Sequence, residues 1–319
     1  MGPTASGKTD LAVELAGRLD CELISVDATL VYRGLDIGSA KPVYPHHLID
    51  IRDPAERYSA AEFVLDTVRL CRDITERGRT PLLVGGTMLY FRAFLFGLAE
   101  MPPADSDVRA SIAREAELLG WPALHARLAD VDPASAAKIH PNHSQRISRA
   151  LEVYRASGVA LSDWHARGPS ADTWLNPFDH FRVVQLAIAP AQREILHERI
   201  ERRLHLMMAA GLVGEVQQLR LRRDLHTDLP ALRAVGYRQI WRYLAGESDF
   251  ATAQAQTLAA TRQLAKRQLT WLRKWPDLSW IYTDHQGNLA RTEESEELWD
   301  DLAGKPLNLA MHYLQGPSL

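Results

Sequence analysis

The start of the chain constrains the fold more than any other stretch. Gly2-Pro3-Thr4-Ala5-Ser6-Gly7-Lys8-Thr9 matches the phosphate-loop pattern G-x-x-x-x-G-K-[ST] at every fixed position. The glycines let successive backbone N–H groups curl around phosphate oxygens, Lys8 adds a positive charge, and the Thr9 hydroxyl can hold a Mg²⁺ ion. Apolar residues at helical spacing follow from Asp10 to Leu19, so the loop opens onto a helix N-terminus that favours anions. The motif predicts binding of a polyphosphate or pyrophosphate, without specifying a nucleotide.

The remaining pattern of the chain predicts an α/β fold. A phosphate loop normally follows a buried strand, whereas only Met1 precedes it here, so we expect that the sequence lacks a leading strand. A helix is predicted to begin at Ser59, whose spacing to Glu62 is that of a capping box. Short apolar runs predict four strands, which are Glu22–Val26, Leu48–Ile51, Pro81–Val84 and Phe181–Ile188. The predicted core is P-loop NTPase-like, with a parallel sheet flanked by helices.

The segment from about residue 101 to residue 178 differs from its surroundings. Helical periodicity dominates it, and no strand pattern appears before Phe181. We interpret it as an all-helical insertion between strands of the core sheet. The predicted domains are a catalytic core formed by residues 1–104 and 179–319 and a helical insertion domain formed by residues 105–178.

Composition narrows the class of protein. Hydrophobic residues make up 46% of the 319 residues, as in a globular chain, and no apolar run approaches the length that spans a membrane. Cys21 and Cys71 offer no metal spacing and are expected to be reduced, in a cytoplasmic protein. The net charge is −3, yet the stretch from Arg182 to Lys274 holds 16 Lys and Arg against 8 Asp and Glu. A basic face for nucleic acid and a solvated helix surface both explain this excess.

Polar residues follow two of the predicted strands. Asp27 comes directly after the first, and Thr87 follows a glycine turn after Pro81–Val84. Because the carboxyl ends of the strands face the ligand crevice in such sheets, Asp27 lies where a general base or a metal-binding carboxylate belongs. Thr87 suits a ligand contact or a helix cap. Ser39 and Lys41 lie in an aperiodic loop and are predicted to reach phosphate.

Two helical stretches carry cations in patterns that suit RNA. Arg146 and Arg149 lie one turn apart on one helix face, and residues 261–275 interleave cations with indoles. Such an arrangement suits phosphate contact and stacking on unpaired bases. A packed helix with long basic side chains along its surface has the same pattern. Trp271 is predicted to be a core residue.

Together these stretches resemble the tRNA dimethylallyltransferase family, also called tRNA isopentenyltransferases, in order and over nearly the whole chain. The phosphate loop is shared with many proteins, but its combination with the other motifs is specific to this family. The sequence departs from the family in its missing leading strand and in its short stretch from Pro42 to Pro45, and we interpret both as absent residues. The matching segments are GPTASGKT from Gly2, ISVDATLVYRGLDIGSAKP from Ile24, PHHLIDIRDP from Pro45, LLVGGTMLY from Leu82, HPNHSQRISRALEVY from His140, RAVGYRQ from Arg233 and TRQLAKRQLTWLRKW from Thr261.

The resemblance implies a Mg²⁺-dependent prenyl transfer. A dimethylallyl group would pass from dimethylallyl pyrophosphate to the N6 amine of the tRNA adenosine immediately 3′ of the anticodon, with release of pyrophosphate. The resemblance implies Asp27 as the base on that amine, Thr87 near the reacting base, and Arg109 near the reaction channel. Thr9 would hold the metal ion. The implied pyrophosphate-binding residues are Gly2, Thr4, Ala5, Ser6, Gly7, Lys8, Thr9, Ser39 and Lys41.

We expect a monomer, and the resemblance also implies that it contacts the anticodon arm of tRNA, in part through the helical insertion domain. The implied tRNA contacts are Asp27, Ala28, Thr29, Leu30, Gln145, Arg146, Ile147, Ser148, Arg149, Arg233, Gly236, Tyr237, Arg238, Lys266, Arg267, Gln268 and Arg273.

Two other classes of function share part of this pattern. A small-molecule or nucleotide kinase would use the same loop with ATP. However, the strand Pro81–Val84 ends in Gly-Gly-Thr rather than in the acidic residue that often holds Mg²⁺ in ATPases. A non-catalytic RNA-binding protein would not need Lys8, Thr9 and Asp27 together.

Overall fold

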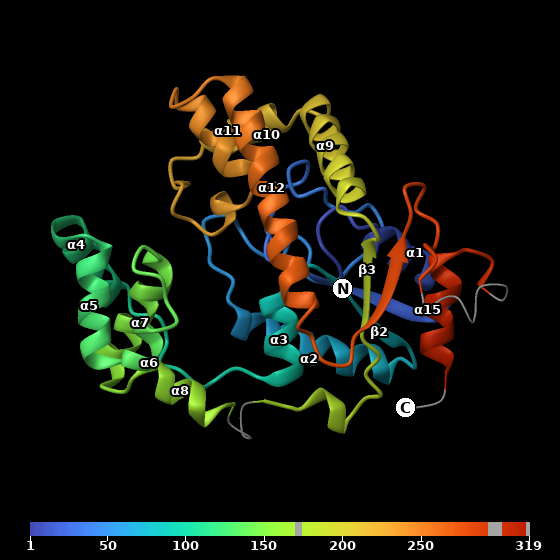
Figure 1. Ribbon diagram of the computed structural model, residues 1–319, viewed down its shortest axis with the longest axis horizontal. Coiled ribbons are helices and arrows are strands. Elements are labelled where there is room, and N and C mark those ends of the chain that lie inside the picture. The colour runs from blue at the N-terminus through green and yellow to red at the C-terminus, as the bar shows by residue number, and fades with distance from the viewer. Residues whose placement is uncertain (170–173, 293–301, 317–319) are drawn as a thin grey trace. The chain divides into compact units, whose positions relative to one another are not determined.

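The computed structural model describes residues 1–169, 174–292 and 302–316, and the chain divides into two compact units (Figure 1). The first unit is Met1–Phe94 with Phe181–Leu319, and the second is Leu95–His180. The predicted insertion, residues 105–178, falls inside the second unit, which begins ten residues earlier and ends two residues later.

Two pairs of parallel strands form the sheet structure of the first unit. Strand β1 (Cys21–Val26) pairs with β2 (Thr80–Gly85), and β3 (Leu186–Pro190) pairs with β4 (Ser279–Thr283). The backbone of Met1 lies beside β3, because its carbonyl oxygen accepts the Ile188 N–H at 3.0 Å. The α/β class with parallel strands is therefore confirmed, with the strands in two pairs.

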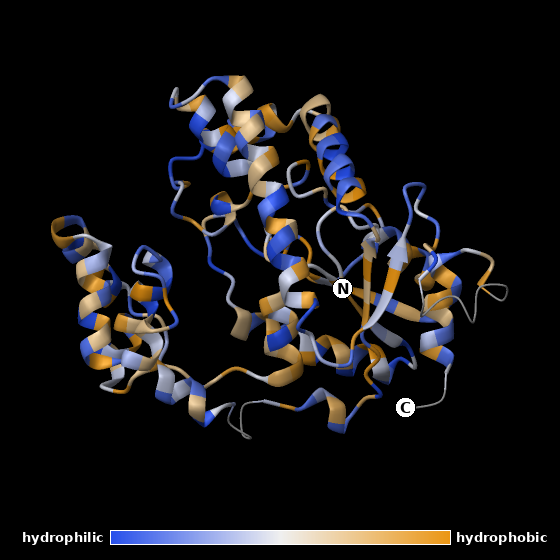
Figure 2. Cartoon of the chain, in the orientation of Figure 1, coloured by the Kyte–Doolittle hydropathy of each residue, from blue (hydrophilic) through white to orange (hydrophobic). Residues whose placement is uncertain are grey.

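Helices surround these strands in the first unit. They are α1 (Lys8–Ala16), α2 (Ala60–Glu76), α3 (Met88–Phe96, which continues into the second unit), α9 (Arg193–Ala209), α10 (Leu212–Arg220), the short η2 (Ala231–Arg233), α11 (Tyr237–Leu244), α12 (Phe250–Leu272) and α15 (Pro306–Gln315). Figure 2 shows hydrophilic residues along much of α9, interrupted by hydrophobic positions. The capping box predicted at Ser59 is confirmed, since its side chain accepts the Glu62 N–H and the Glu62 side chain accepts the Ser59 N–H.

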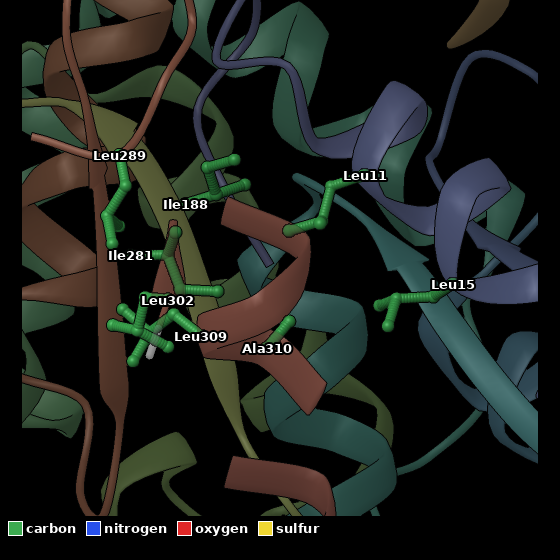
Figure 3. Close-up of a cluster of buried hydrophobic side chains, with 8 residues drawn as sticks. All are labelled: Leu11, Leu15, Ile188, Ile281, Leu289, Leu302, Leu309 and Ala310. Atoms are coloured by element: carbon green, nitrogen blue, oxygen red, sulfur yellow. The ribbon is translucent and has the colours of Figure 1, made fainter. Parts of the chain in front are cut away.

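A hydrophobic cluster joins the strands of the second pair to helices from both ends of the chain (Figure 3). Apolar side chains lose contact with water there, which supplies the main stabilising term of such a core. The cluster fixes α1, and with it the phosphate loop, against β3 and β4. Its buried members are Leu11, Leu15, Ile188, Ile281, Leu289, Leu302, Leu309 and Ala310.

Within its described residues, the second unit contains helices and no strand. A core of apolar residues from α4, α5, α6 and α7 holds it together, with Ile112, Leu124 and Ile147 fully buried. Its elements are α4 (Ser106–Leu119), α5 (Trp121–Val131), α6 (Pro133–Ala136), α7 (Ser144–Ser157), α8 (Leu161–Arg167) and the short η1 (Pro177–Asp179). In the described ranges, no helix is both long and apolar enough to cross a membrane.

Two predicted strands differ from the structure. The prediction for Leu48–Ile51 is wrong, because Leu48 and Asp50 have positive φ angles of 64° and 57°, which break an extended strand. The predicted strand from Phe181 is β only from Leu186 onward. Strand β4 and helix α15 lie in stretches for which we predicted no element.

Gly85 permits the close pairing of β1 and β2 and generates a stability prediction. A Cβ atom at this position would overlap the Val26 carbonyl group of the neighbouring strand. Gly85→Ala should lower the free energy of unfolding by about 3 kcal/mol or more, because the backbone cannot move aside cheaply. Gly78→Ala is the control, since Gly78 has a φ of 75° but open space around it. That variant should lose only about 1 kcal/mol. Denaturant unfolding of both variants tests this, and equal losses would contradict it.

Candidate functional site

The phosphate loop has the backbone geometry of an anion site. Gly7 and Ala5 have φ angles of 90° and 62°, in the left-handed region, which turns successive N–H groups toward one side. Helix α1 begins at Lys8, and no side chain caps its first turn. The N–H groups at the start of α1 are therefore available to an anion, which the helix dipole favours.

Helix α12 braces this loop against the turn after β2. The Gln268 amide oxygen accepts the Thr4 N–H at 2.9 Å, and its amide nitrogen donates to the Gly86 carbonyl oxygen at 2.9 Å. Gln268 is 9% exposed, so this bridge lies inside the protein. We predicted a tRNA contact for Gln268. The structure instead uses its side chain to join the phosphate loop to the turn that carries Thr87.

Asp27 and Thr87 follow the carboxyl ends of β1 and β2, as their positions in the sequence predict. Thr87 donates its N–H to the Val26 carbonyl oxygen at 3.2 Å, and its hydroxyl accepts the Ala28 N–H at 3.0 Å. One carboxylate oxygen of Asp27 accepts the Thr29 N–H at 2.8 Å. These bonds orient the half-buried Asp27 carboxylate and leave it other lone pairs for a ligand.

Charges from three elements converge beside the loop. Burial and the neighbouring Arg203 guanidinium lower the pKa of the Lys8 amine to about 8, while the carboxylates of Asp27 and Asp10 oppose this shift. Burial also lowers the pKa of Arg203, which Asp27 and Asp10 again oppose. Two partly desolvated cations therefore stand near the carboxylates of Asp27 and Asp10, and an incoming anion would relieve their repulsion.

Arg203 is not among the site residues predicted from the sequence. It lies on α9, which carries three other arginines within ten residues of it. The basic composition of α9 was a visible signal, but nothing in the sequence separates Arg203 from its neighbours. Only the fold brings it to Lys8 and Asp27.

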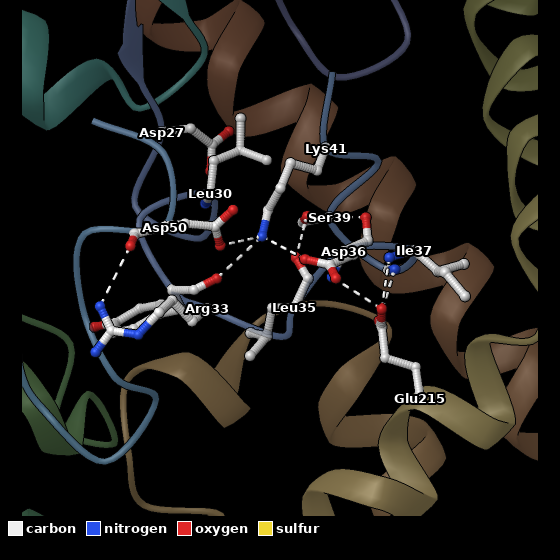
Figure 4. A network of polar contacts seen from close by, with 12 residues as sticks. Asp27, Leu30, Arg33, Leu35, Asp36, Ile37, Ser39, Lys41, Asp50 and Glu215 are labelled. Carbon is white, nitrogen blue, oxygen red and sulfur yellow. Dashed lines mark hydrogen bonds and ion pairs between the residues drawn. The ribbon is translucent and has the colours of Figure 1, made fainter. Parts of the chain in front are cut away.

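Polar side chains in the loop after β1 form ion pairs and hydrogen bonds within the loop itself (Figure 4). Lys41 forms ion pairs with Asp36 and Asp50, and its side chain is only 12% exposed. The Ser39 hydroxyl donates to the Leu35 carbonyl oxygen. These bonds do not favour the predicted role of Lys41 and Ser39 in pyrophosphate binding, because both side chains already have partners within the loop.

In the second unit, a buried carboxylate organises two of the predicted arginines. Glu152 is 1% exposed. Its carboxylate accepts hydrogen bonds from the Arg109 guanidinium at 2.9 Å and from the Asp105 N–H at 2.9 Å. Arg149 lies 3.5 Å from the same carboxylate and donates to the Pro102 carbonyl oxygen at 3.0 Å. Both arginine side chains are about one-third exposed.

The predicted tRNA contacts fall into exposed and buried groups. Buried members have no side-chain surface to offer: Ile147 and Tyr237 are 0% exposed, which argues against direct contact through their side chains. Trp271, predicted as core, is 37% exposed, so that prediction is wrong. The exposed members are Ala28, Gln145, Arg146, Arg233, Arg238, Lys266, Arg267 and Arg273, and the partly buried ones are Asp27, Thr29, Leu30, Ser148 and Arg149.

The lowered pKa of Lys8 generates a test without substrate. The fraction of reactive neutral amine should rise through a midpoint near pH 8, whereas exposed lysines titrate about two units higher. Arg203→Met should move the Lys8 midpoint upward, because it removes a repelling positive charge. Competitive lysine labelling across pH, read by peptide mass spectrometry, measures both midpoints. A Lys8 midpoint near that of an ordinary lysine amine would contradict the lowered pKa of Lys8.

Comparisons with known proteins identify the family. A model for the family described as IPP transferase matches residues 30–275. The tRNA dimethylallyltransferase 2 of Hahella chejuensis is 56% identical over 298 residues, which cover 89% of this chain and 90% of that protein. The solved tRNA isopentenylpyrophosphate transferase of Bacillus halodurans is 35% identical with a TM-score of 0.63, covering 98% of this chain and 97% of the other.

A structure of a eukaryotic dimethylallyltransferase acting on tRNA has a TM-score of 0.69 at 25% identity, covering 94% of this chain and 74% of that one. The family and the fold class predicted from the sequence are confirmed, and these relatives give no support to a kinase. The chain therefore belongs to the IPP transferase family, whose members transfer a prenyl group to tRNA.

Proposed function

We propose that this chain transfers the dimethylallyl group of dimethylallyl pyrophosphate to the N6 amine of the tRNA adenosine immediately 3′ of the anticodon. The observation that carries the proposal is the convergence of an anion-binding loop and a carboxylate. Lys8 and Arg203 stand beside Asp27, so a pyrophosphate leaving group and a proton acceptor share one site. The Thr87 hydroxyl accepts the N–H of Ala28, the residue next to the proton acceptor Asp27.

The phosphate loop stabilises the leaving group. As the allylic C–O bond breaks, its electron pair passes to the pyrophosphate oxygen, and negative charge grows there. The N–H groups of the loop, the Lys8 amine and the Arg203 guanidinium stabilise that charge, which is strongest in the transition state. Because the groups are held before the reaction, little reorganisation is needed at the moment of bond breaking.

Asp27 accepts the proton of the attacking amine. The N6 nitrogen forms a bond to the allylic carbon and becomes positively charged, and the loss of one proton to the Asp27 carboxylate restores neutrality. An adenine amine is a weak nucleophile and is unreachable in a stacked strand, so the base must first be turned out of its stack. The Thr29 N–H donates to the Asp27 carboxylate and the Thr87 hydroxyl accepts the neighbouring Ala28 N–H, and both bonds keep Asp27 in place for this transfer.

The Thr9 hydroxyl and the phosphates of the substrate are oxygen ligands of the kind that Mg²⁺ prefers. This ion keeps several waters and binds through one or two protein oxygens together with substrate phosphates. The Thr9 hydroxyl, on the first turn of α1, provides such an oxygen, and no group of three or more metal-binding side chains occurs within the described ranges. When bound, Mg²⁺ would supply further charge neutralisation to the pyrophosphate.

The exposed arginines and lysines contact the anticodon arm in this proposal. Arg146 lies at the start of α7 in the second unit, and Lys266, Arg267 and Arg273 lie on or just after α12 in the first. Phosphate contacts of this kind position an RNA, and contacts to the turned-out base select it. A monomeric state and a cytoplasmic location belong to the same proposal.

Asp27→Asn tests the assigned base. With unmodified tRNA, dimethylallyl pyrophosphate and Mg²⁺, the wild-type chain should form prenylated adenosine, measured by mass spectrometry of digested tRNA. Asp27→Asn should lower kcat by about 10²–10⁴ with tRNA affinity nearly unchanged, because it removes the proton acceptor but keeps its size. Asp10→Asn is the control, since the Asp10 carboxylate, like that of Asp27, raises the pKa of Lys8, but Asp10 is exposed.

Near-normal turnover in Asp27→Asn would exclude Asp27 as the base. Phosphate transfer from ATP, with no prenylated product from the wild-type chain, would instead overturn the whole function.

Salt dependence tests the tRNA contacts. Each phosphate that a cation neutralises releases condensed counterions, so the log–log slope of affinity against salt is roughly 0.7–0.9 per contact. Arg146→Ala and Arg267→Ala should each flatten the slope by about one contact and weaken different tRNAs alike. Arg77→Ala is the control, because Arg77 pairs with Glu22 at the amino end of β1. Slopes that match the wild type in both test variants would contradict the assigned contacts.

A further inference from the structure

Glu215, on the first turn of α10, holds a loop that reaches the reaction site. We propose that Glu215 is a positioning residue for Arg203 and, through it, for the pyrophosphate end of the substrate. The inference rests on the proposed role of Arg203 in binding pyrophosphate. No contact of Glu215 with the substrate is involved.

The Glu215 carboxylate gathers three consecutive backbone N–H groups (Figure 4). One oxygen accepts the N–H of Asp36 at 2.9 Å and that of Ile37 at 2.7 Å, and the other accepts the N–H of Gly38 at 3.1 Å. Bonds to an ionised acceptor are stronger than neutral ones, so this carboxylate fixes the loop backbone at three successive residues.

A buried tyrosine fixes the carboxylate in turn. The Tyr237 hydroxyl donates to Glu215 at 2.6 Å, and Tyr237 is 0% exposed. Burial and this hydrogen bond raise the pKa of Tyr237, so its hydroxyl keeps the proton that it donates. Glu215 therefore cannot turn away from the loop without leaving a buried donor unpaired.

At Gly38 the loop lies directly against the side chains of Tyr237 and Leu212. A Cβ atom added to Gly38 would come within 2.7 Å of the Tyr237 ring and 2.8 Å of the Leu212 side chain. This close approach leaves little room for the backbone at Gly38 to shift. The position of the next residue, Ser39, is thereby determined as well.

Ser39 connects the anchored loop to the reaction site. Its carbonyl oxygen accepts a hydrogen bond from the Arg203 guanidinium at 3.3 Å. Arg203 is partly buried beside the positive Lys8, and the lowered pKa of its guanidinium shows that burial disfavours the charged form. A fixed carbonyl oxygen compensates part of that cost and sets the direction of the guanidinium. The path from Glu215 to Arg203 thus runs through one short stretch of backbone.

A positioning role and a purely structural role predict different coupling. If Glu215 only stabilises the fold, its loss should lower the melting temperature and act independently of Arg203. If it orients Arg203, the two residues should be strongly coupled in pyrophosphate affinity, because removing Arg203 removes the group that Glu215 positions.

A double-mutant cycle on the full chain measures this coupling, with inorganic pyrophosphate and Mg²⁺ as the probe in calorimetric titrations. Arg203→Met should weaken pyrophosphate binding by roughly 10- to 100-fold, as expected for a lost hydrogen bond to a charged group. Glu215→Ala should weaken it by about tenfold, as for other residues that orient a ligand-binding group. In the Arg203→Met background, the same change should add less than about twofold.

Asp53→Ala is the matched structural control. Asp53 accepts hydrogen bonds from Arg222 at 2.7 Å and 2.8 Å and ties a later stretch of the loop after β1, fourteen residues beyond Ser39, to the chain just after α10. It should lower the melting temperature but leave pyrophosphate affinity unchanged. Glu215→Gln, which retains the size of the side chain, replaces Glu215→Ala in the cycle if the alanine variant does not fold.

The outcomes separate the two proposals. If the fold losses of pyrophosphate affinity in the Glu215 and Arg203 variants multiply in the double variant, the positioning role is overturned and the proposed function stays intact. Unchanged affinity in Arg203→Met would overturn both the role of Arg203 in pyrophosphate binding and the inference drawn from it. Loss of affinity in Asp53→Ala equal to that in Glu215→Ala would show that general destabilisation explains the effect.

Discussion

The close approach of β1 and β2 at their carboxyl ends is the constraint on which the site depends. Gly85 has no side chain, so its backbone pairs tightly with Val26. The segments that follow β1 and β2 therefore stay close to each other. Thr87 then bonds to the backbone on both sides of Asp27, at Val26 and at Ala28. The carboxylate is therefore set by the strand pairing itself rather than by a flexible loop, which is how a rigid scaffold preorganises a reacting group.

Residues from the second half of the chain complete what these strands begin. Gln268 joins the phosphate loop to the turn after β2, and Arg203 brings a second cation to Lys8. Glu215 fixes the stretch of backbone that Arg203 bonds. Each contact spans a long separation in the sequence, so the site forms only when the first unit is folded as a whole. Such long-range assembly couples binding strength to fold stability.

Local patterns predicted the parts of the molecule that depend on neighbours in the sequence. The phosphate loop, the capping box at Ser59 and the strands around Asp27 follow from composition and spacing over a few residues. The strand predicted at Leu48–Ile51 failed because apolar spacing does not reveal a positive φ. Lys41 has the type and place of a phosphate ligand, yet the fold brings Asp36 and Asp50 to it. Arg203 was one arginine among several until its position in space was known.

The most direct test of the central claim is the position of a bound substrate analogue. A crystal structure of the chain with Mg²⁺ and dimethylallyl thiopyrophosphate, whose C–S bond resists cleavage, would show it. We expect the pyrophosphate to lie against the backbone N–H groups from Gly7 to Thr9, in contact with Lys8 and Arg203, with the allylic carbon directed toward Asp27. A pyrophosphate bound away from this loop, or an allylic carbon directed away from Asp27, would contradict it.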